Sequence, residues 1–79
     1  MSNWKFIGAC SDGERFEIEK TNVWDHKWIR REGQKAEVKD PLYNQDFHFE
    51  VFQISIFNRH IVFAAGEFSN CIWGFYVPA

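Results

Sequence analysis

Apolar and polar side chains alternate in the manner of β-strands through residues 47–77, and the rest of the chain must be arranged around this stretch. It holds nine of the fifteen aromatic residues but only three formal charges. Two short polar segments, Asn58-Arg59 and Ser69-Asn70, interrupt it. Because two-residue turns join antiparallel neighbours, the pattern predicts a three-stranded meander.

The two turns also fix a register for the meander. Phe52 is placed opposite Ala65 and Gly66 opposite Trp73, so that small residues face large ones. Since side chains alternate between the faces of a strand, one face is almost wholly apolar and is the expected core. A three-residue loop at 58–60 is the alternative, and it would exchange the two faces. The other predicted partners are Ile54 with Phe63, Ile56 with Ile61, Phe63 with Tyr76 and Ala65 with Gly74, with Ile72 and Tyr76 on the core face.

A second hairpin signal lies near the amino end of the chain. Residues 4–10 and 15–21 flank Asp12-Gly13, which is a favourable pair for a two-residue turn. The register set by this turn gives the hairpin one buried face and one largely solvated face. We therefore predict an outer antiparallel pair with one face in water.

Residues 22–33 are compatible with two structures. As a helix over 23–32, they have Asn22 as the N-cap and a glycine just beyond the last turn. As a strand, they turn at Glu32-Gly33 and return through 35–39, where apolar and charged residues alternate. The strand is preferred because that alternation needs a partner, although it places two basic residues opposite each other.

Together these elements predict an all-β fold, a small antiparallel meander of about six or seven strands that forms a curled sheet or a small barrel. The alternative is an α+β fold with one short helix at 23–32 packed on an antiparallel sheet. With 79 residues, 46% of them hydrophobic and 25% charged, the chain is expected to be a single domain over 1–79. No apolar run reaches the ~20 residues of a membrane helix and no signal peptide is apparent, so we expect a cytoplasmic protein.

The two cysteines are too few for a disulfide framework or a four-cysteine zinc site. Cys10 and Cys71 are expected to be reduced, buried thiols, with a bridge between them as the alternative. The sequence has no phosphate-binding loop, dinucleotide-binding glycine pattern or metalloprotease helix motif. We therefore expect neither a cofactor nor enzymatic activity.

Three residues nevertheless form a candidate metal or hydrolytic site. In the predicted register Glu50 faces Glu67, and His48 lies on the same face. Facing carboxylates repel unless they hold a cation, share a proton or turn into water. An imidazole with two carboxylates suits several divalent metals. The alternative is a solvated rim at which lysine or arginine pairs with the glutamates.

Aromatic and basic residues gather between positions 24 and 31. Trp24, His26 and Trp28 share one face of the predicted strand, and Arg30 and Arg31 follow them. Rings and cations in this arrangement bind bases, sugars or other proteins. The alternative is that the tryptophans cover the open end of the sheet while the cations are solvated.

The net charge of −2 argues against a general nucleic-acid backbone binder, because such proteins carry a basic excess. We therefore expect a small non-enzymatic module that binds another protein, or a second copy of itself, through exposed aromatic and basic residues. The metal-dependent or hydrolytic site is one alternative function. Single-stranded nucleic-acid or sugar binding at Trp24 and Trp28 is another.

Overall fold

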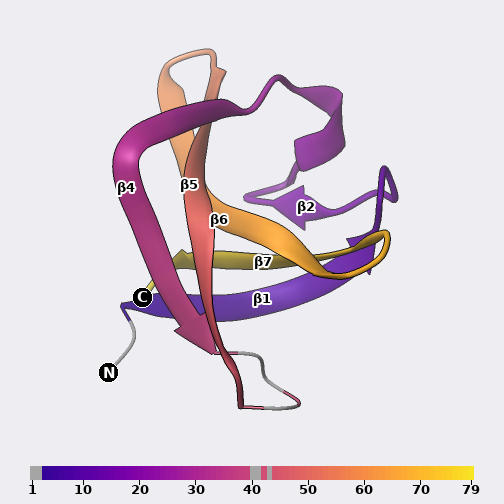
Figure 1. Cartoon of the computed structure of the whole chain (residues 1–79). Coiled ribbons are helices and arrows are strands. Elements are labelled where there is room, and N and C mark those ends of the chain that lie inside the picture. Colours follow the sequence, from indigo (N-terminus) through magenta and orange to yellow (C-terminus); the bar gives the residue numbers. More distant parts are fainter. Residues whose placement is uncertain (1–2, 40–41, 43) are drawn as a thin grey trace.

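The computed structural model describes residues 3–39, 42 and 44–79. They form a five-stranded antiparallel sheet in the order β1-β7-β6-β5-β4 and a two-stranded sheet of β2 and β3 (Figure 1). The all-β prediction is therefore confirmed. No helix in these residues is long and apolar enough to cross a membrane. The elements are β1 (Trp4–Ser11), β2 (Glu17–Ile18), β3 (Thr21–Asn22), the 3₁₀ turn η1 (Val23–Asp25), β4 (Ile29–Lys39), β5 (Asp46–Ile56), β6 (Arg59–Ser69) and β7 (Ile72–Pro78).

The main sheet is strongly bent but open. In Figure 1, β4 turns sharply partway along its length, and β1 and β7 run across the direction of β5. Gly33 lies in this irregular part of β4 with φ 77, and the pairing of β4 with β5 shifts between Arg30 and Lys35. The two edge strands, β1 and β4, form no ladder with each other in the described residues. Of the two predicted shapes, the curled sheet is present and the closed barrel is not.

The predicted meander is present as β5, β6 and β7, but its first hairpin has a different register. Phe52 pairs with Phe63 rather than with Ala65. The turn is Phe57-Asn58, where Asn58 takes φ 70, a left-handed conformation that asparagine adopts more readily than most residues. Because partners move by two positions, the side chains keep the predicted faces. The other two predicted pairs are wrong in the same way, since Ile54 pairs with Ile61 and Ile56 with Arg59.

The second hairpin is displaced by one position, and this exchanges the faces of β7. Gly66 pairs with Gly74 instead of Trp73. A bulge between Glu67 and Ser69 accommodates the extra residue. The core-face prediction is therefore wrong for β7, because Tyr76 packs in the cluster on the opposite face and Ile72 is exposed. The turn is Asn70-Cys71 and not Ser69-Asn70. Tyr76 pairs with Ala64 and not with Phe63, and Ala65 pairs with Phe75 and not with Gly74.

The predicted amino-terminal hairpin is wrong. The turn at Asp12-Gly13 forms, with Gly13 at φ 79, but β1 pairs with β7 and not with residues 15–21. Side chains of β1 contribute to the apolar clusters on both faces of the sheet. Such a strand needs cover on both faces, which the position beside β7 in the main sheet supplies and a two-residue partner such as β2 cannot.

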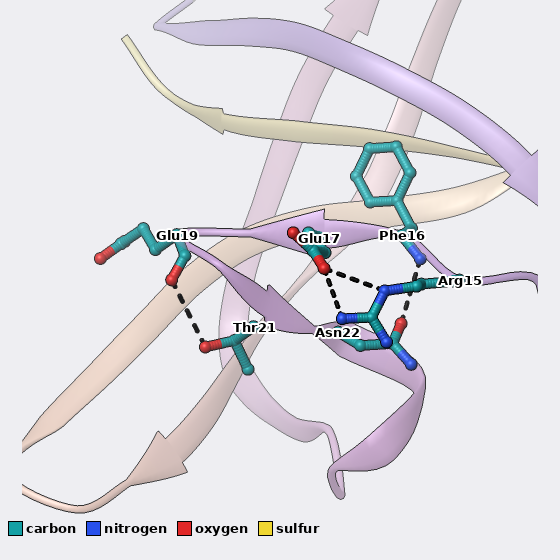
Figure 2. Close-up of polar contacts among 6 residues, drawn as sticks. All are labelled: Arg15, Phe16, Glu17, Glu19, Thr21 and Asn22. Atoms are coloured by element: carbon teal, nitrogen blue, oxygen red, sulfur yellow. Dashed lines mark hydrogen bonds and ion pairs between the residues drawn. The ribbon is translucent and has the colours of Figure 1, made fainter.

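β2 and β3 form a small separate hairpin (Figure 2). The Phe16 N–H donates to Asn22 Oδ1 at 3.0 Å, which closes its open end. The turn residues Glu19 and Lys20 have φ 50 and 65, a conformation that is unfavourable for residues with a side chain. Arg59 of β6 donates to Glu19 Oε1 at 3.1 Å and so joins this turn to the tip of the main sheet.

Neither structure predicted for residues 22–33 is present. The helix is reduced to η1, and the hairpin at Glu32-Gly33 is replaced by one bent strand, β4. The two basic residues predicted to face each other, Arg30 and Lys35, instead pair with Phe52 and Glu50 of β5. The segment before β4 is therefore free to fold over the sheet instead of extending it.

The main sheet carries an apolar cluster on each of its two faces. The first cluster centres on Ile54, Ile61, Phe63 and Phe75, none of which is exposed, and the segment from Phe16 to Trp28 packs over it. The second cluster fills the curl of the sheet and contains the following buried residues: Ala36, Val38, Phe49, Val51, Ala64 and Tyr76.

The two cysteines lie in different environments. Cys10 is buried in the first cluster and Cys71 is exposed at the turn between β6 and β7. Both are free thiols, as expected. The prediction that Cys71 is buried is wrong. The position of Cys71 follows from the one-residue displacement of that turn.

Candidate interaction groove

A groove of about 680 Å³ lies between β1 and β4, the two edges of the main sheet. We call it the edge groove. Its rim residues on β4 and β5 are exposed, so it is open to solvent. Its apolar wall consists of Trp4, Phe6, Val38 and Tyr76, and its polar rim consists of Asn3, Lys35, Glu37, Lys39, Asp46 and His48.

The apolar wall of the edge groove is held in place from behind. The Phe6 ring lies 5.3 Å from the Tyr76 ring and 6.0 Å from the Phe68 ring, measured between centroids. Tyr76 Oη donates to the Lys39 carbonyl at 2.7 Å, which ties β7 to the end of β4. Because these rings also belong to the second cluster, the wall is fixed before any ligand arrives.

The hydrogen bond of Tyr76 also shows which way the peptide groups of β4 point. In an antiparallel ladder each residue directs its N–H and C=O to the same side, and successive residues alternate. The Lys39 carbonyl points to Tyr76 and hence away from β5. By alternation the peptide groups of Lys35 and Glu37 also point away from β5. The edge groove is thus bordered by strand backbone at every second residue of β4.

The other edge, β1, is less suited to pairing with a further strand. Its register shifts between Phe6 and Gly8, and such bulges interrupt an edge. At its far end, the Ser11 N–H donates to Glu14 Oε1 at 3.0 Å and the Ser11 carbonyl accepts from the Glu14 N–H at 2.9 Å. β4 is therefore the more accessible of the two edges.

The charges on the rim are arranged in cross-strand pairs. Lys39 Nζ lies 3.0 Å from Asp46 Oδ1, and His48 Nε2 lies 3.5 Å from Glu37 Oε1. Lys35 forms no ion pair within the described residues. All of these side chains are exposed, so the pairs contribute little to stability, about 0–1 kcal/mol each. They leave Lys35 as the cation able to meet an incoming acidic group.

The residues predicted to form an exposed binding surface are only partly brought to the surface. The Trp24 and Trp28 rings are half-buried, 4.9 Å apart, and both belong to the cover of the first cluster. Trp28 Nε1 donates to the Val23 carbonyl at 2.7 Å. The prediction that these two rings are exposed is therefore wrong, and the alternative, in which they cover the sheet, is correct.

The remaining predicted binding residues differ from one another. His26 is exposed and Arg31 is half-buried. Arg30 lies 3.2 Å from Glu50 Oε1 and 3.8 Å from Glu32 Oε1. The three side chains therefore do not form a joint site with the tryptophan rings.

The geometric basis of the predicted metal site is also wrong. Glu50 faces Ala65 and not Glu67, because of the changed register, and it is paired with Arg30. His48 pairs with Glu37 on β4. In the part of the chain that the structure describes, no group of three histidine, cysteine, aspartate or glutamate side chains could hold a metal ion. His48 and Glu50 instead resemble the solvated rim that was the alternative.

A cluster of polar side chains lies outside the edge groove, near the tip of β5 and β6. Ser55 Oγ lies 3.0 Å from His60 Nδ1, and Gln53 Nε2 lies 3.3 Å from Ser55 Oγ. A serine nucleophile needs a base that is itself oriented by a third group. Within the described residues no carboxylate forms an ion pair with His60, so this exposed pair lacks that third group.

Sequence reasoning missed the residues that form the edge groove. Trp4, Phe6 and Tyr76 were assigned only to strands, and their meeting depends on the pairing of β1 with β7. It also missed Phe57, whose ring is 90% exposed at the turn after β5. The alternation of lysine and glutamate along 35–39 was the available signal, because charges in this pattern are typical of edge strands.

No family model, no curated protein and no solved structure matches this chain.

Proposed function

We propose that this protein is a small non-enzymatic module that binds another polypeptide chain by adding a strand of it along β4. The observation that carries the proposal is the edge groove, in which strand backbone directed away from β5 lies next to a preformed aromatic wall. Backbone hydrogen bonds supply the affinity in strand addition, and pockets for alternate side chains supply the specificity.

The charge of β4 supports an acidic segment as the partner. β4 has four basic and two acidic side chains, whereas the whole chain has a net charge of −2. Opposite charge favours encounter and register, and like charge disfavours wrong partners. An extended peptide with an acidic residue near Lys35 and an apolar residue against the aromatic wall fits this groove.

A protein partner is favoured over a nucleic acid because the rings that would stack bases are half-buried in the cover of the first cluster. Trp24 and Trp28 lie over the first cluster, and the wall of the edge groove borders peptide groups and not a broad basic surface. The expected cytoplasmic location remains part of this proposal, and both thiols being free is compatible with it.

The proposal is tested by selecting linear ten-residue peptides from a displayed library on immobilised protein. The matched variants are Lys35→Pro, which removes an N–H directed away from β5, and Lys35→Arg, which keeps both this N–H and the positive charge. Selected peptides should bind the arginine variant nearly as well as the wild type and lose at least about tenfold in affinity on the proline variant. Melting curves of both variants establish that the fold is kept.

Hydrogen exchange locates the bound peptide. The Lys35 amide should exchange quickly in the free protein and slowly in the complex, while amides of the 16–28 segment should not change. Absence of any selected binder, equal binding to the proline variant, or protection confined to another surface would each refute strand addition at β4.

A further inference from the structure

We infer that the segment added along β4 is the free carboxyl terminus of another polypeptide, which runs antiparallel to β4 and places its α-carboxylate beside Arg31 and Lys35. This inference rests on the proposed strand addition and names the chemical class of the partner. It is carried by a second hollow, of about 170 Å³, which lies in the irregular part of β4 and is lined by residues 30–35 and Glu50. We call it the bulge hollow.

The bulge hollow adjoins the edge groove, because Lys35 lines both. The regular part of β4 begins at Lys35, whose peptide group points away from β5 by the alternation described above. Before it, residues 31–34 lie opposite a single residue of β5, Val51, and β4 turns sharply partway along its length (Figure 1). An added strand can therefore follow the regular part of β4 only as far as Lys35, and its end lies at the bulge hollow.

The charges of the bulge hollow match a single negative group. Three cations and two carboxylates line it, which gives a net charge of +1. Arg30 Nη1 lies 3.2 Å from Glu50 Oε1, and Arg30 Nη2 lies 3.8 Å from Glu32 Oε1. Arg31 and Lys35 form no ion pair within the described residues. One carboxylate balances the hollow, whereas a phosphoryl group, with a charge of about −1.5 to −2, exceeds it.

The direction of the added strand follows from the same charges. In an antiparallel pair, the Lys35 N–H donates to the carbonyl of the residue opposite it. When that residue is the last of its chain, the acceptor is an oxygen of the α-carboxylate, and the hydrogen bond is charge-assisted. A parallel strand brings its amino end to Arg31 and Lys35 instead, where like charges repel. The antiparallel direction is therefore the one that the hollow favours.

The register also predicts a side chain that the protein selects. With the last residue opposite Lys35, the fourth residue from the carboxyl end lies opposite Val38, which belongs to the apolar wall of the edge groove. Residues opposite each other in an antiparallel pair share a face of the sheet, so this side chain is directed to the wall. The carboxylate contact is made at the Lys35 end of β4 and does not need the Lys39 carbonyl, which Tyr76 occupies. We therefore expect an apolar residue at the fourth position from the end.

Two libraries of ten-residue peptides test the inference on the folded protein. They are identical except that one has a free carboxyl terminus and the other a carboxyl-terminal amide. Binders should come from the free-acid library and share the apolar residue at the fourth position from the end. Amidation of a binder, or its extension by two glycines at the carboxyl end, should lower the affinity at least about tenfold, because each change removes the terminal charge from the hollow. Acetylation of the amino end should leave the affinity unchanged.

Variants of Arg31 locate the carboxylate. Measured by fluorescence polarisation, Arg31→Gln should weaken a free-acid binder by about tenfold but change the binding of its amide little, and Arg31→Lys, which keeps the charge, should retain more of the affinity. Arg15→Gln is the matched control, because exposed Arg15 pairs with Glu17 outside both hollows and its loss should not affect binding. Melting curves establish that each variant is folded.

The possible results separate this inference from the proposed function. Binders that are lost on Lys35→Pro but tolerate amidation and extension refute the carboxylate contact and leave strand addition in place. Binders that are lost on Lys35→Pro and on amidation, but are indifferent to Arg31→Gln in both forms, refute the position of the carboxylate. Binders that are indifferent to Lys35→Pro, or the absence of binders from both libraries, refute strand addition and this inference together.

Discussion

Gly66 and Gly74 are paired on neighbouring strands, and each is covered by an aromatic ring. An ideal Cβ at Gly66 would lie 2.4 Å from Cδ1 and 2.6 Å from Cε1 of Phe49. Carbon atoms in favourable contact are about 3.5–4.0 Å apart. Gly66→Ala therefore forces the Phe49 ring to move by about 1 Å or more.

The Phe49 ring has little freedom to make that movement. It is 7% exposed and lies 5.4 Å from the Phe47 ring and 5.7 Å from the Phe68 ring. Overpacking of this kind costs about 1–3 kcal/mol. Without the clash, a glycine-to-alanine change at a compatible site stabilises by about 0.4–1 kcal/mol, so the sign of the effect is informative. In a domain of this size the expected loss lowers the melting temperature by about 4–8 °C per kcal/mol.

Urea denaturation followed by circular dichroism gives the free energy of unfolding of Gly66→Ala, Phe49→Leu and the double variant. The smaller leucine should relieve the clash, so the double variant should be more stable than the sum of the single effects by about 0.5–3 kcal/mol. Gly13→Ala is the matched control, because nothing lies within 4 Å of its Cβ and its effect should be additive with Phe49→Leu. A neutral or stabilising Gly66→Ala, or additivity of the test pair, would contradict the packing argument.

Three further substitutions test other contacts by the same denaturation assay. Lys20→Gly should stabilise by about 0.5–1 kcal/mol, because φ 65 at this turn position favours glycine, and a loss of stability would show that the conformation is not strained. Trp28→Phe should cost about 1–3 kcal/mol, because it leaves the Val23 carbonyl without its donor, and the cost should exceed that of Trp24→Phe, whose Nε1 has no hydrogen-bond partner among the described residues. Tyr76→Phe should cost about 0.5–1.5 kcal/mol and should speed amide exchange at the end of β4, whereas unchanged exchange would mean that the hydroxyl does not hold that strand.

The fold class could be predicted from the sequence because alternation and turn residues are local signals. The meander of β5, β6 and β7 follows directly from them. The registers could not be fixed in the same way, since they depend on which turn residue takes a positive φ. Asn58 and Cys71 do so at 70 and 66, which places the first turn one position earlier and the second turn one position later than the alternation suggested.

Long-range pairing was the part that local signals could not supply. Asp12-Gly13 does form a turn, yet the strands on either side of it have different partners. β1 has apolar side chains on both faces, and both are covered where it pairs with β7, the last strand of the chain. The edge groove depends on this pairing, because it brings Trp4 and Phe6 next to Tyr76. A site formed by residues from opposite ends of the chain has no local sequence signature.

The aromatic content has a different meaning in the structure from the one that the sequence suggested. A surplus of rings predicted an exposed binding surface, but the bent sheet has two apolar faces and most of the rings cover them. Binding along β4 would then depend on the peptide groups of the strand and on its order of charges, while substitution of Trp24 or Trp28 would lower stability and affect binding only through the fold. Proline substitution at outward-facing positions of β4 therefore separates recognition from folding, which removal of the large rings cannot do.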